Sequence, residues 1–344
     1  MYYFQLIITN ISIFIFTYLL FKRFNLFIDN TTFSIHKKIG NENNSPVVMG
    51  GIYIFLISLV NLPVNSLETN LVFFFILILG LMSDKNILTN TKLRFFLQIF
   101  LVLSLVFINN LKIDDLRIIF LNELLDNYFI NIFFTTFCLV ILINGSNFID
   151  GLNGLLCGYY IMIIGSIIFI GNYNFEINFF NKNIIEIIFF SLLIFLIPNL
   201  FGKVYLGDGG SYLISTIIGY YLIKFYFINS NISPYYISLL LWYPAFENLF
   251  SLIRRVISKK TISNPDNRHL HQIIFIYLKK RSLFLKRNLN SISSAIILLL
   301  NLPGFVLANF YYDESLILGI VLIFNLVMYC LIYYKMSKYL KLIN

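Results

Sequence analysis

Charged side chains are scarce in this chain of 344 residues, at 12% of the total. Soluble domains carry about 25% charged residues and lack long apolar stretches, so the composition excludes a soluble globular protein. Only three cysteines are present, Cys138, Cys157 and Cys330, all inside apolar segments. Such an odd, scattered set has neither metal-ligand spacing nor the pattern of a disulfide framework. The N-terminal apolar segment lacks a basic start and a small-residue cleavage site, and we predict that it is retained as the first membrane span.

Hydrophobic residues make up 59% of the chain, and the mean hydropathy is +0.82. Nearly uncharged stretches recur from one end to the other, each about long enough to cross a hydrocarbon core of roughly 30 Å as a helix. The centres of the eleven candidate spans lie near residues 11, 55, 76, 102, 137, 162, 192, 218, 243, 301 and 325. The sequence therefore predicts an all-α, polytopic transmembrane bundle that forms a single integral membrane domain, residues 1–344.

Basic residues are distributed unevenly among the loops that eleven spans would leave. Most of the 25 Lys and Arg residues fall on one side of the predicted membrane. The segments of this side are residues 22–46, 84–94, 145–153, 202–209, 254–292 and the tail after residue 335. The opposite side, which includes loops 111–128 and 172–183, holds few. The positive-inside rule then makes the first set cytoplasmic, with the N-terminus outside and the C-terminus inside. The net charge of +9 thus indicates topology and not a nucleic-acid partner.

The segment from Ile273 to Arg287 begins apolar and then carries several Lys and Arg residues. One interpretation is a basic helix that lies along the anionic inner leaflet of the membrane. The other is simple flanking charge of the kind that sets topology. The sequence alone leaves both open.

Acids and histidines gather in four of the predicted cytoplasmic segments. The four are Gly80-Leu81-Met82-Ser83-Asp84, Asn144-Gly145-Ser146-Asn147-Phe148-Ile149-Asp150-Gly151, Gly207-Asp208-Gly209-Gly210-Ser211 and Pro265-Asp266-Asn267-Arg268-His269-Leu270-His271. Carboxylates at span ends are costly to desolvate and tend to mark function. Because all four segments fall on the side assigned from Lys and Arg alone, we predict that they form one site.

The residue types in these segments suit phosphoryl transfer. Carboxylate oxygens from Asp84, Asp150 and Asp208 match the preference of Mg²⁺, which is often held by one or two carboxylates plus substrate phosphates. Glycines beside Asp208 would let the backbone approach a phosphate, and a helix that starts near Ser211 would point its amides at that anion. The donors for a diphosphate or nucleotide would be Arg268, His269 and His271.

Each piece taken singly has a plainer explanation. Asp84 could be a helix cap or a topology residue, and the glycines near Asp208 could only permit a tight turn. Asn144 and Asn147 could cap a helix. Paired histidines in a loop are most often exposed bystanders. Only the co-occurrence of the four segments in this order is specific.

That order resembles the polyprenyl-phosphate N-acetylhexosamine-1-phosphate transferase family of the glycosyltransferase 4 type, over almost the whole chain. The family includes O-antigen initiating transferases and the phospho-N-acetylmuramoyl-pentapeptide translocase. The matching positions are Ser83 and Asp84, then Arg94 and Gln98, Asn144, Asn147, Asp150 and Gly151, Gly207, Asp208, Gly210 and Ser211, and Pro265, Asp266, His269 and His271. Three positions depart from the family pattern. Ser83 and Asn153 replace aspartates and Gln272 replaces a histidine, and none of the three can serve as a carboxylate base.

The resemblance implies transfer of an N-acetylhexosamine-1-phosphate from a UDP-sugar to undecaprenyl or another polyprenyl phosphate, with release of UMP. The implied cofactor is Mg²⁺, with Mn²⁺ as an alternative, and the implied metal ligands are Asp208 and Asp84. Asp84, Asp150 and Asp208 would be catalytic. The substrate-binding residues would be Asn144, Asn147, Gly207, Arg268, His269 and His271. The expected location is the inner (cytoplasmic) membrane, with the site on its cytoplasmic face.

The same resemblance implies a role in cell wall, cell-envelope polysaccharide or O-antigen lipopolysaccharide biosynthesis. Expected partners are the lipid phosphate, the UDP-N-acetylhexosamine and the bilayer, while a homodimer stays open. Two other functions also stay open. A secondary transporter would carry its polar residues near the bilayer midplane, often with an internal repeat, and an inactive homologue would explain the three departures.

Overall fold

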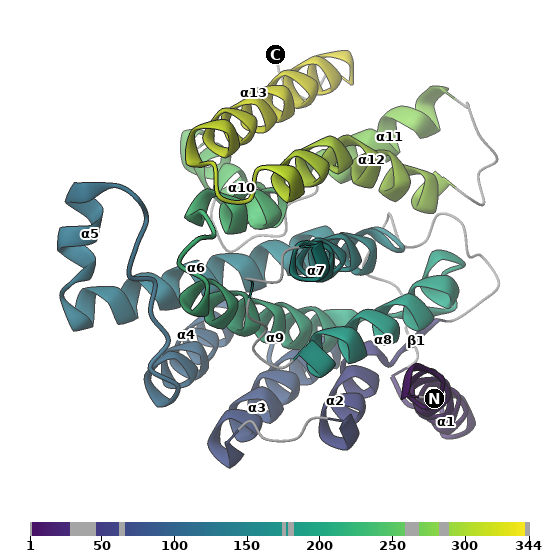
Figure 1. Cartoon of the computed structure of the whole chain (residues 1–344). Helices are drawn as coiled ribbons and strands as arrows, with labels where there is room; N and C mark the ends of the chain where they lie inside the picture. The colour runs from purple at the N-terminus through teal and green to yellow at the C-terminus, as the bar shows by residue number, and fades with distance from the viewer. Residues whose placement is uncertain are drawn as a thin grey trace.

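The computed structural model describes residues 2–27, 46–61, 66–173, 177, 182–258, 268–281 and 289–340. Within these residues it contains thirteen helices and one pair of very short strands (Figure 1). The helices are α1 (Tyr2–Arg23), α2 (Gly50–Asn61), α3 (Leu67–Asp84), α4 (Thr91–Ile108), α5 (Ile119–Leu125), α6 (Tyr128–Ile149), α7 (Leu155–Tyr173), α8 (Lys182–Leu200), α9 (Gly207–Ile228), α10 (Pro234–Ile257), α11 (Leu270–Arg281), α12 (Leu289–Phe310) and α13 (Ser315–Tyr339). The predicted all-α architecture is confirmed.

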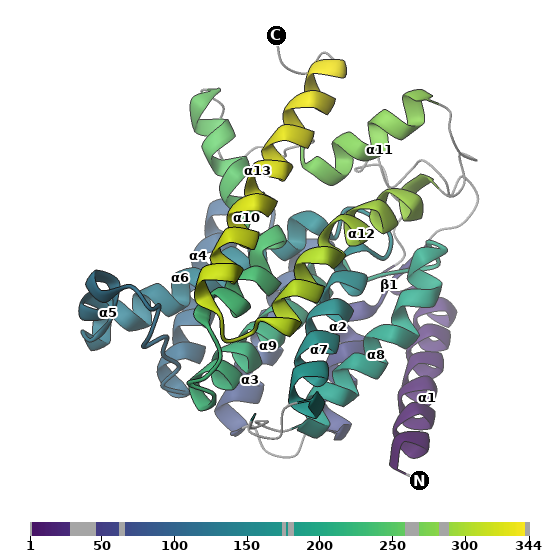
Figure 2. The same ribbon diagram turned by 45° about the horizontal axis from the view of Figure 1, so that its top comes forward.

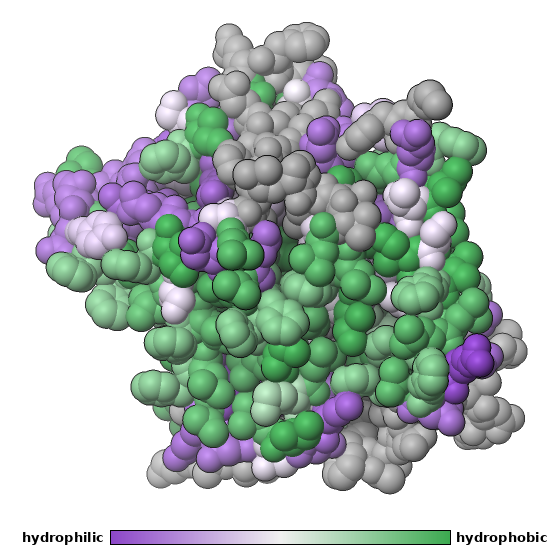
Figure 3. Space-filling model, turned by 90° about the horizontal axis from the view of Figure 1, so that it is seen from below, coloured by the Kyte–Doolittle hydropathy of each residue, from purple (hydrophilic) through white to green (hydrophobic). Residues whose placement is uncertain are grey.

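Ten of these helices are long and apolar enough to cross a membrane. The eleventh predicted span corresponds to α2, whose apolar part is shorter (Gly50–Leu59). Seen from below the view of Figure 1, the surface carries a broad hydrophobic band with hydrophilic residues at its upper and lower edges (Figure 3). Exposed apolar side chains on this scale would be unfavourable in water, and a lipid environment accounts for them. The prediction of a multi-pass membrane protein therefore holds.

Helix starts follow local sequence signals. Ser66, Asn90, Asn127 and Ser233 each accept a backbone N–H of the following helix on a side-chain oxygen. Such N-caps satisfy amide donors that the first turn of a helix leaves without a partner. The sequence thereby determines where α3, α4, α6 and α10 begin.

Helix α9 occupies the centre of the bundle, while α13 lies at its edge (Figures 1 and 2). In the most apolar stretch of α9, 78% is buried, whereas in that of α13 only 11% is buried. Packed around α9 are α2, α3 and α6. The residues at the start of α9 are therefore held on several sides by other helices.

Two features were not expected from the sequence. Strands β1 (Val47–Val48) and β2 (Val204–Tyr205) pair in parallel, with Val47 opposite Val204. This pairing sets the start of α2 beside the start of α9. Helix α5 is a short additional element that projects from one side of the bundle (Figure 1).

The segment Ile273–Arg287, for which the sequence left an interfacial helix and simple flanking charge open, is described as far as Arg281. The described helix, α11, starts at Leu270 and ends at Arg281, and its apolar residues, including Ile273, Ile274 and Phe275, are buried. Helix α11 packs on α12 and α13, so these residues face protein and not lipid. The rest of the segment, residues 282–287, lies outside the described residues.

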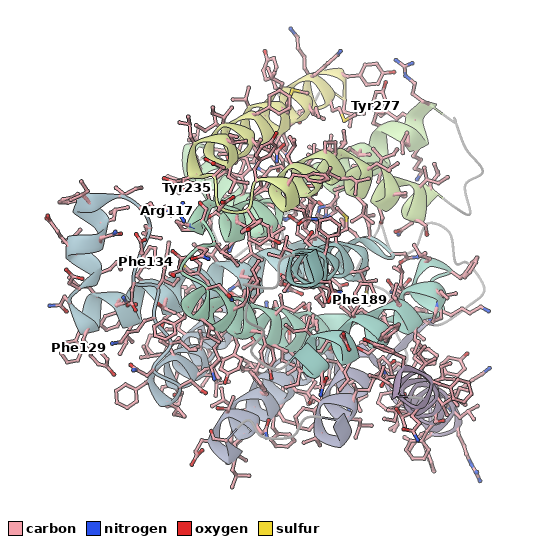
Figure 4. All side chains as sticks on the ribbon, in the orientation of Figure 1. Arg117, Phe129, Phe134, Phe189, Tyr235 and Tyr277 are labelled. Atoms are coloured by element: carbon pink, nitrogen blue, oxygen red, sulfur yellow. The ribbon has the colours of Figure 1, made fainter. Side chains whose placement is uncertain are left out.

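The end of the molecule away from the candidate site is tied together by Arg117 (Figure 4). Its guanidinium donates to the carbonyl of Asp313 at 2.7 Å, to Ser315 Oγ at 2.8 Å and to the carbonyl of Asn231 at 3.2 Å. These contacts join the segment before α5 to the α9–α10 and α12–α13 connections. Arg117, which the sequence assigns to the outer side, thus has a structural role.

Candidate active site

The predicted site residues lie where helices end or begin at one end of the bundle. Asp84 is the last residue of α3, Asp150 directly follows α6, and Asp208 lies in the first turn of α9. His269 directly precedes α11. Contacts between these helix ends, described below, bring together segments more than a hundred residues apart in the sequence.

Asp208 lies in a small polar group with Ser83 and Arg94. Ser83 Oγ donates to Asp208 Oδ2 at 2.5 Å. Arg94 donates from Nη1 to Ser83 Oγ, and the same nitrogen lies 3.5 Å from Asp208 Oδ2. The Arg94 and Asp208 side chains are 27% and 28% exposed, so a ligand can reach both. Ser83, which replaces an aspartate of the family pattern, here links the Arg94 guanidinium to the Asp208 carboxylate through its neutral hydroxyl.

Asp84 binds the N-terminus of α9. Its Oδ1 accepts the amide of Asp208 at 2.8 Å, and its Oδ2 accepts the amide of Gly209 at 3.0 Å. A carboxylate at this position also interacts favourably with the helix dipole. Helix α9 begins at Gly207 and not near Ser211 as predicted. The first amides that we expected to face a phosphate are therefore occupied by a carboxylate of the protein itself.

The glycines of this region allow helices α2, α3 and α9 to approach one another closely. A Cβ on Gly80 would lie 2.4 Å from Gly209 Cα, and one on Gly51 would lie 2.8 Å from the amide of Gly210. Small residues at such crossings let membrane helices pack backbone to backbone. Gly207 has a φ of +73°, which a residue with a side chain rarely adopts. Helix packing thus accounts for glycines that the sequence assigned to phosphate approach.

The C-terminal end of α6 contacts several neighbouring helices. Asn144 Nδ2 donates to Gln98 Oε1 of α4 at 2.8 Å, and Asn147 Oδ1 accepts from Ser211 Oγ of α9 at 3.0 Å. Both asparagines lie inside α6, so the helix-cap interpretation is wrong for them. Their side chains fix the position of α6 against the helices that carry Arg94 and Asp208.

Asp150 forms the C-terminal boundary of α6, and its amide donates to the carbonyl of Ser146. Next to it, the amide of Asn153 donates to Asn290 Oδ1 at 2.6 Å, and the amide of Gly154 donates to Asn199 Oδ1 at 2.7 Å. The structure therefore places Asp150 at the same end of the bundle as Asp84 and Asp208. Asn153 contributes to the turn through its backbone.

A second polar group surrounds the histidines, and its central residue is Glu247 of α10. Glu247 Oε1 lies 2.9 Å from His269 Nδ1 and accepts the amide of Leu270 at 3.3 Å. Glu247 Oε2 accepts from the hydroxyl of Tyr329 at 2.9 Å. Glu247 is fully buried. Sequence analysis missed it, although a lone acid inside an apolar span is the signal that could have found it.

Both histidine rings are buried, at 3% exposed for His269 and 0% for His271, so they are not exposed bystanders. The ring of His269 contacts two other rings, those of His271, with centroids 5.5 Å apart, and of Phe148 of α6, with centroids 4.8 Å apart. Arg268 is partly exposed. Pro265 and Asp266 lie outside the described residues.

The donor set does not form a closed metal centre. Among the described residues, no three His, Cys, Asp or Glu side chains lie close enough together to hold one metal ion. Asp84 uses both oxygens on backbone amides, and Asp208 shares Oδ2 with Ser83 and Arg94. These residues fit a cation that binds together with substrate phosphates, since Mg²⁺ commonly takes few protein oxygens and several from phosphate and water.

Comparisons with known proteins show similarity to one family of transferases. Residues 67–226 match the model of glycosyl transferase family 4. The chain is 29% identical over 209 residues to a probable undecaprenyl-phosphate N-acetylglucosaminyl 1-phosphate transferase of Bacillus subtilis, covering 59% of this chain and 56% of that protein. It is 31% identical over 133 residues to an undecaprenyl-phosphate alpha-N-acetylglucosaminyl 1-phosphate transferase of Thermotoga maritima, covering 38% and 39%.

The chain thus matches about half or less of the length of each relative. The family match contains Asp84, Asn147, Asp150 and Asp208, and it ends before Glu247 and the histidines. The helix ends that assemble around Asp208 lie within residues 67–226, and this part of the chain is similar to glycosyl transferase family 4.

Proposed function

We propose that the protein transfers N-acetylglucosamine-1-phosphate from UDP-N-acetylglucosamine to undecaprenyl phosphate, with release of UMP. The observation that carries the proposal is the reachable group of Asp208, Ser83 and Arg94, held by Asp84 at a helix end. Both relatives are named as undecaprenyl-phosphate N-acetylglucosaminyl 1-phosphate transferases, which supports the proposal. A role in the first step of a cell-envelope polysaccharide follows from the product and belongs to the same proposal.

The reaction needs charge neutralisation and positioning more than a strong base. A phosphate monoester has a second pKa near 6, so the lipid phosphate is largely a dianion at pH 7. One of its oxygens forms a bond to the β-phosphorus of the sugar nucleotide, and the bond between that phosphorus and the bridging oxygen breaks. The bridging oxygen leaves with UMP. Catalysis of such a step rests mainly on electrostatic stabilisation of the phosphoryl group.

The residues around Asp208 divide these tasks. Arg94 has a partly exposed guanidinium, which is proposed to form paired hydrogen bonds with oxygens of the reacting phosphates. Asp208, with Asp84 behind it, is proposed to hold Mg²⁺, for which Mn²⁺ could substitute. Bound there, the cation would neutralise charge on the diphosphate. Asp150 is proposed to contact the lipid phosphate or accept its remaining proton.

The segment that contains His269 and His271, residues 268–272, is called the histidine segment and is proposed to bind the nucleotide. Arg268 is partly exposed, whereas His269 and His271 are buried. In this arrangement Arg268 supplies a charge that a diphosphate can reach, and the two histidines hold the segment in place. Asn144 and Asn147 are proposed to shape the substrate-binding site by connecting α6 to α4 and α9, and Gly207 by its φ of +73° at the start of α9.

The site is proposed to face the cytoplasm from the inner membrane, where UDP-sugars are made. Single cysteines introduced into segment 254–292 and loop 111–128 should then react with a membrane-impermeant maleimide from opposite sides. Segment 254–292 should react only in inverted vesicles. Labelling of both positions from one side would refute the eleven-span topology.

The activity is tested with purified protein, undecaprenyl phosphate and a panel of UDP-sugars, by measuring released UMP. We expect release only when the lipid phosphate and a divalent cation are both present, and EDTA should abolish it. A protein that moves substrate across sealed vesicles without UMP release would be a transporter. The helix-end position of Asp84, Asp150 and Asp208 argues against that alternative. Absence of any UMP release by folded protein would identify an inactive homologue.

A further inference from the structure

Helix α13 is mostly exposed, but one of its faces carries two buried tyrosines. Only 11% of the most apolar stretch of α13 is buried, yet Tyr329 and Tyr333 are 2% and 5% exposed. They lie four residues apart, hence on one side of the helix, and their rings stack with centroids 6.2 Å apart at 9°. This face of α13 packs on α10.

Tyr329 reaches the histidine segment, residues 268–272, through Glu247. The tyrosine hydroxyl donates to Oε2 of Glu247. The other oxygen of Glu247 contacts His269 Nδ1 and accepts the amide of Leu270, the first residue of α11. Because Glu247 is fully buried, its carboxylate depends on these protein donors.

Tyr333 reaches the same segment by a separate route. Its hydroxyl accepts a hydrogen bond from Arg254 Nη1 at 2.5 Å, and the same nitrogen donates to the carbonyl of Arg268 at 2.5 Å. The Arg254 guanidinium also lies 5.3 Å from the centroid of the Tyr333 ring, close enough for a cation–π contact. Glu247 and Arg254 are seven residues apart on α10, and so two turns along the same face.

The two routes hold three consecutive residues of the segment. Arg254 binds the carbonyl of Arg268, and Glu247 binds the ring of His269 and the amide of Leu270. The His269 ring also packs on Phe148, whose neighbour in the sequence, Asn147, accepts a hydrogen bond from Ser211 in the first turns of α9. Side-chain contacts thus connect α13, the histidine segment and the end of α6, and Asn147 connects α6 to the helix that carries Asp208. None of Glu247, Arg254, Tyr329 and Tyr333 lies in the residues matched by the family model.

We infer that Tyr329 and Tyr333 are positioning residues of the active site, which hold the histidine segment in its nucleotide-binding arrangement through Glu247 and Arg254. The inference rests on the proposed function for its kinetic consequence. The contacts themselves can be tested without activity. Neither tyrosine is expected to touch substrate.

The experiment compares Tyr329→Phe, Tyr333→Phe and the double variant in the full-length protein, which removes hydroxyls and leaves the rings. Tyr334→Phe is the matched control, because Tyr334 lies on the same helix and is 56% exposed. Hydrogen–deuterium exchange of residues 268–281 should accelerate about tenfold in the single variants, the scale of one lost hydrogen bond to a charged group. The KM for UDP-N-acetylglucosamine should rise about tenfold, while kcat and the KM for undecaprenyl phosphate stay within about twofold.

Unchanged exchange in the double variant would overturn the inference, whether or not the wild type releases UMP. Accelerated exchange with equal losses in kcat and in both KM values would also overturn it, since that pattern marks general destabilisation. Accelerated exchange confined to residues 268–281, with a selective rise in the nucleotide-sugar KM, would support it. Accelerated exchange in a wild-type background that releases no UMP would support the contacts and refute the proposed function alone.

Discussion

The two halves of the candidate site are built in different ways. The acid half, around Asp84 and Asp208, is assembled by backbones that approach closely at Gly51, Gly80 and Gly209. The histidine half is assembled by long side chains, in which Glu247 and the tyrosines of α13 bridge from one helix to another. Close backbone packing leaves no room for a larger residue at these glycines, whereas the side chains that bridge the helices can be substituted one at a time.

The difference agrees with the extent of the family match. The acid half lies inside residues 67–226, and the histidine half lies beyond them. It also agrees with exposure, because Asp208 and Arg94 can be reached from outside while His269, His271 and Glu247 are buried. We therefore expect changes in the acid half to affect turnover, and changes in the histidine half to affect binding of the nucleotide sugar.

The largest effect is expected for Asp208→Asn, which keeps the size of the side chain and removes its charge. Loss of one preorganised electrostatic group typically lowers turnover by about a hundredfold or more. We expect that loss in kcat for UMP release, with the protein still folded and membrane-inserted. Asp126→Asn, in the exposed C-terminal cap of α5, is the control and should be neutral. Near-normal turnover of Asp208→Asn would show that the carboxylate charge needed for the reaction lies on another residue.

A smaller but clear effect is expected for Gly80→Ala, which tests the backbone packing of the acid half. The new methyl group would lie 2.4 Å from Gly209 Cα, so α3 and α9 must separate. Overpacking of this kind costs about 1–3 kcal/mol. Thermal unfolding in detergent should shift to lower temperature, and UMP release should fall about tenfold.

Gly319→Ala provides the matched control, because nothing lies within 4 Å of a Cβ at Gly319. Alanine is the better helix former by about 1 kcal/mol, so this variant should be as stable as the parent protein or more so. Equal unfolding temperatures for the two alanine variants would show that α3 and α9 are not packed as described.

An intermediate shift in binding is expected for His271→Ala in the histidine half. The buried ring stacks on His269, and its loss should loosen the segment that binds the nucleotide. The KM for the UDP-sugar should rise about tenfold with little change in kcat, as for loss of uniform binding. Lys280→Ala, exposed on the same helix, is the control. A fall in kcat as large as that of Asp208→Asn would erase the proposed division between the two halves.

The smallest effect is expected for Ser83→Asp, which restores the carboxylate of the family pattern. A second anion beside Asp208 would compete for Arg94 and would favour a bound cation. Turnover at saturating Mg²⁺ should stay within about threefold, and half-maximal activity should need less Mg²⁺. Ser83→Ala, which only removes the hydroxyl bridge, should not lower the Mg²⁺ requirement. An unchanged Mg²⁺ titration for Ser83→Asp would separate residue 83 from the cation.

Much of the architecture could be predicted because hydropathy is a local property of the chain. All eleven predicted spans correspond to helices, and N-caps such as Asn90 and Ser233 determine where individual helices begin. Alternation of spans across a membrane then brings Asp84, Asp150, Asp208 and the histidines to one end. This follows from counting spans and needs no knowledge of how the helices pack.

The roles of individual residues could not be predicted in the same way. Asp84 caps α9 through amides 124 and 125 positions away in the sequence. The glycines beside Asp208 serve helix packing, and Asn144 and Asn147 connect helices where the sequence allowed a cap. Glu247 gains its importance only because His269 and Tyr329 pack around it.

The sequence by itself determined the membrane fold, the number of apolar helices and the end of the bundle at which the polar segments meet, because each depends on short stretches of chain. Only the tertiary structure decided which carboxylate binds backbone and which stays reachable, and which histidine contacts Glu247. Those outcomes depend on distances between helices, which close packing at Gly51 and Gly80 sets in the acid half and the side-chain contacts of Glu247 set in the histidine half.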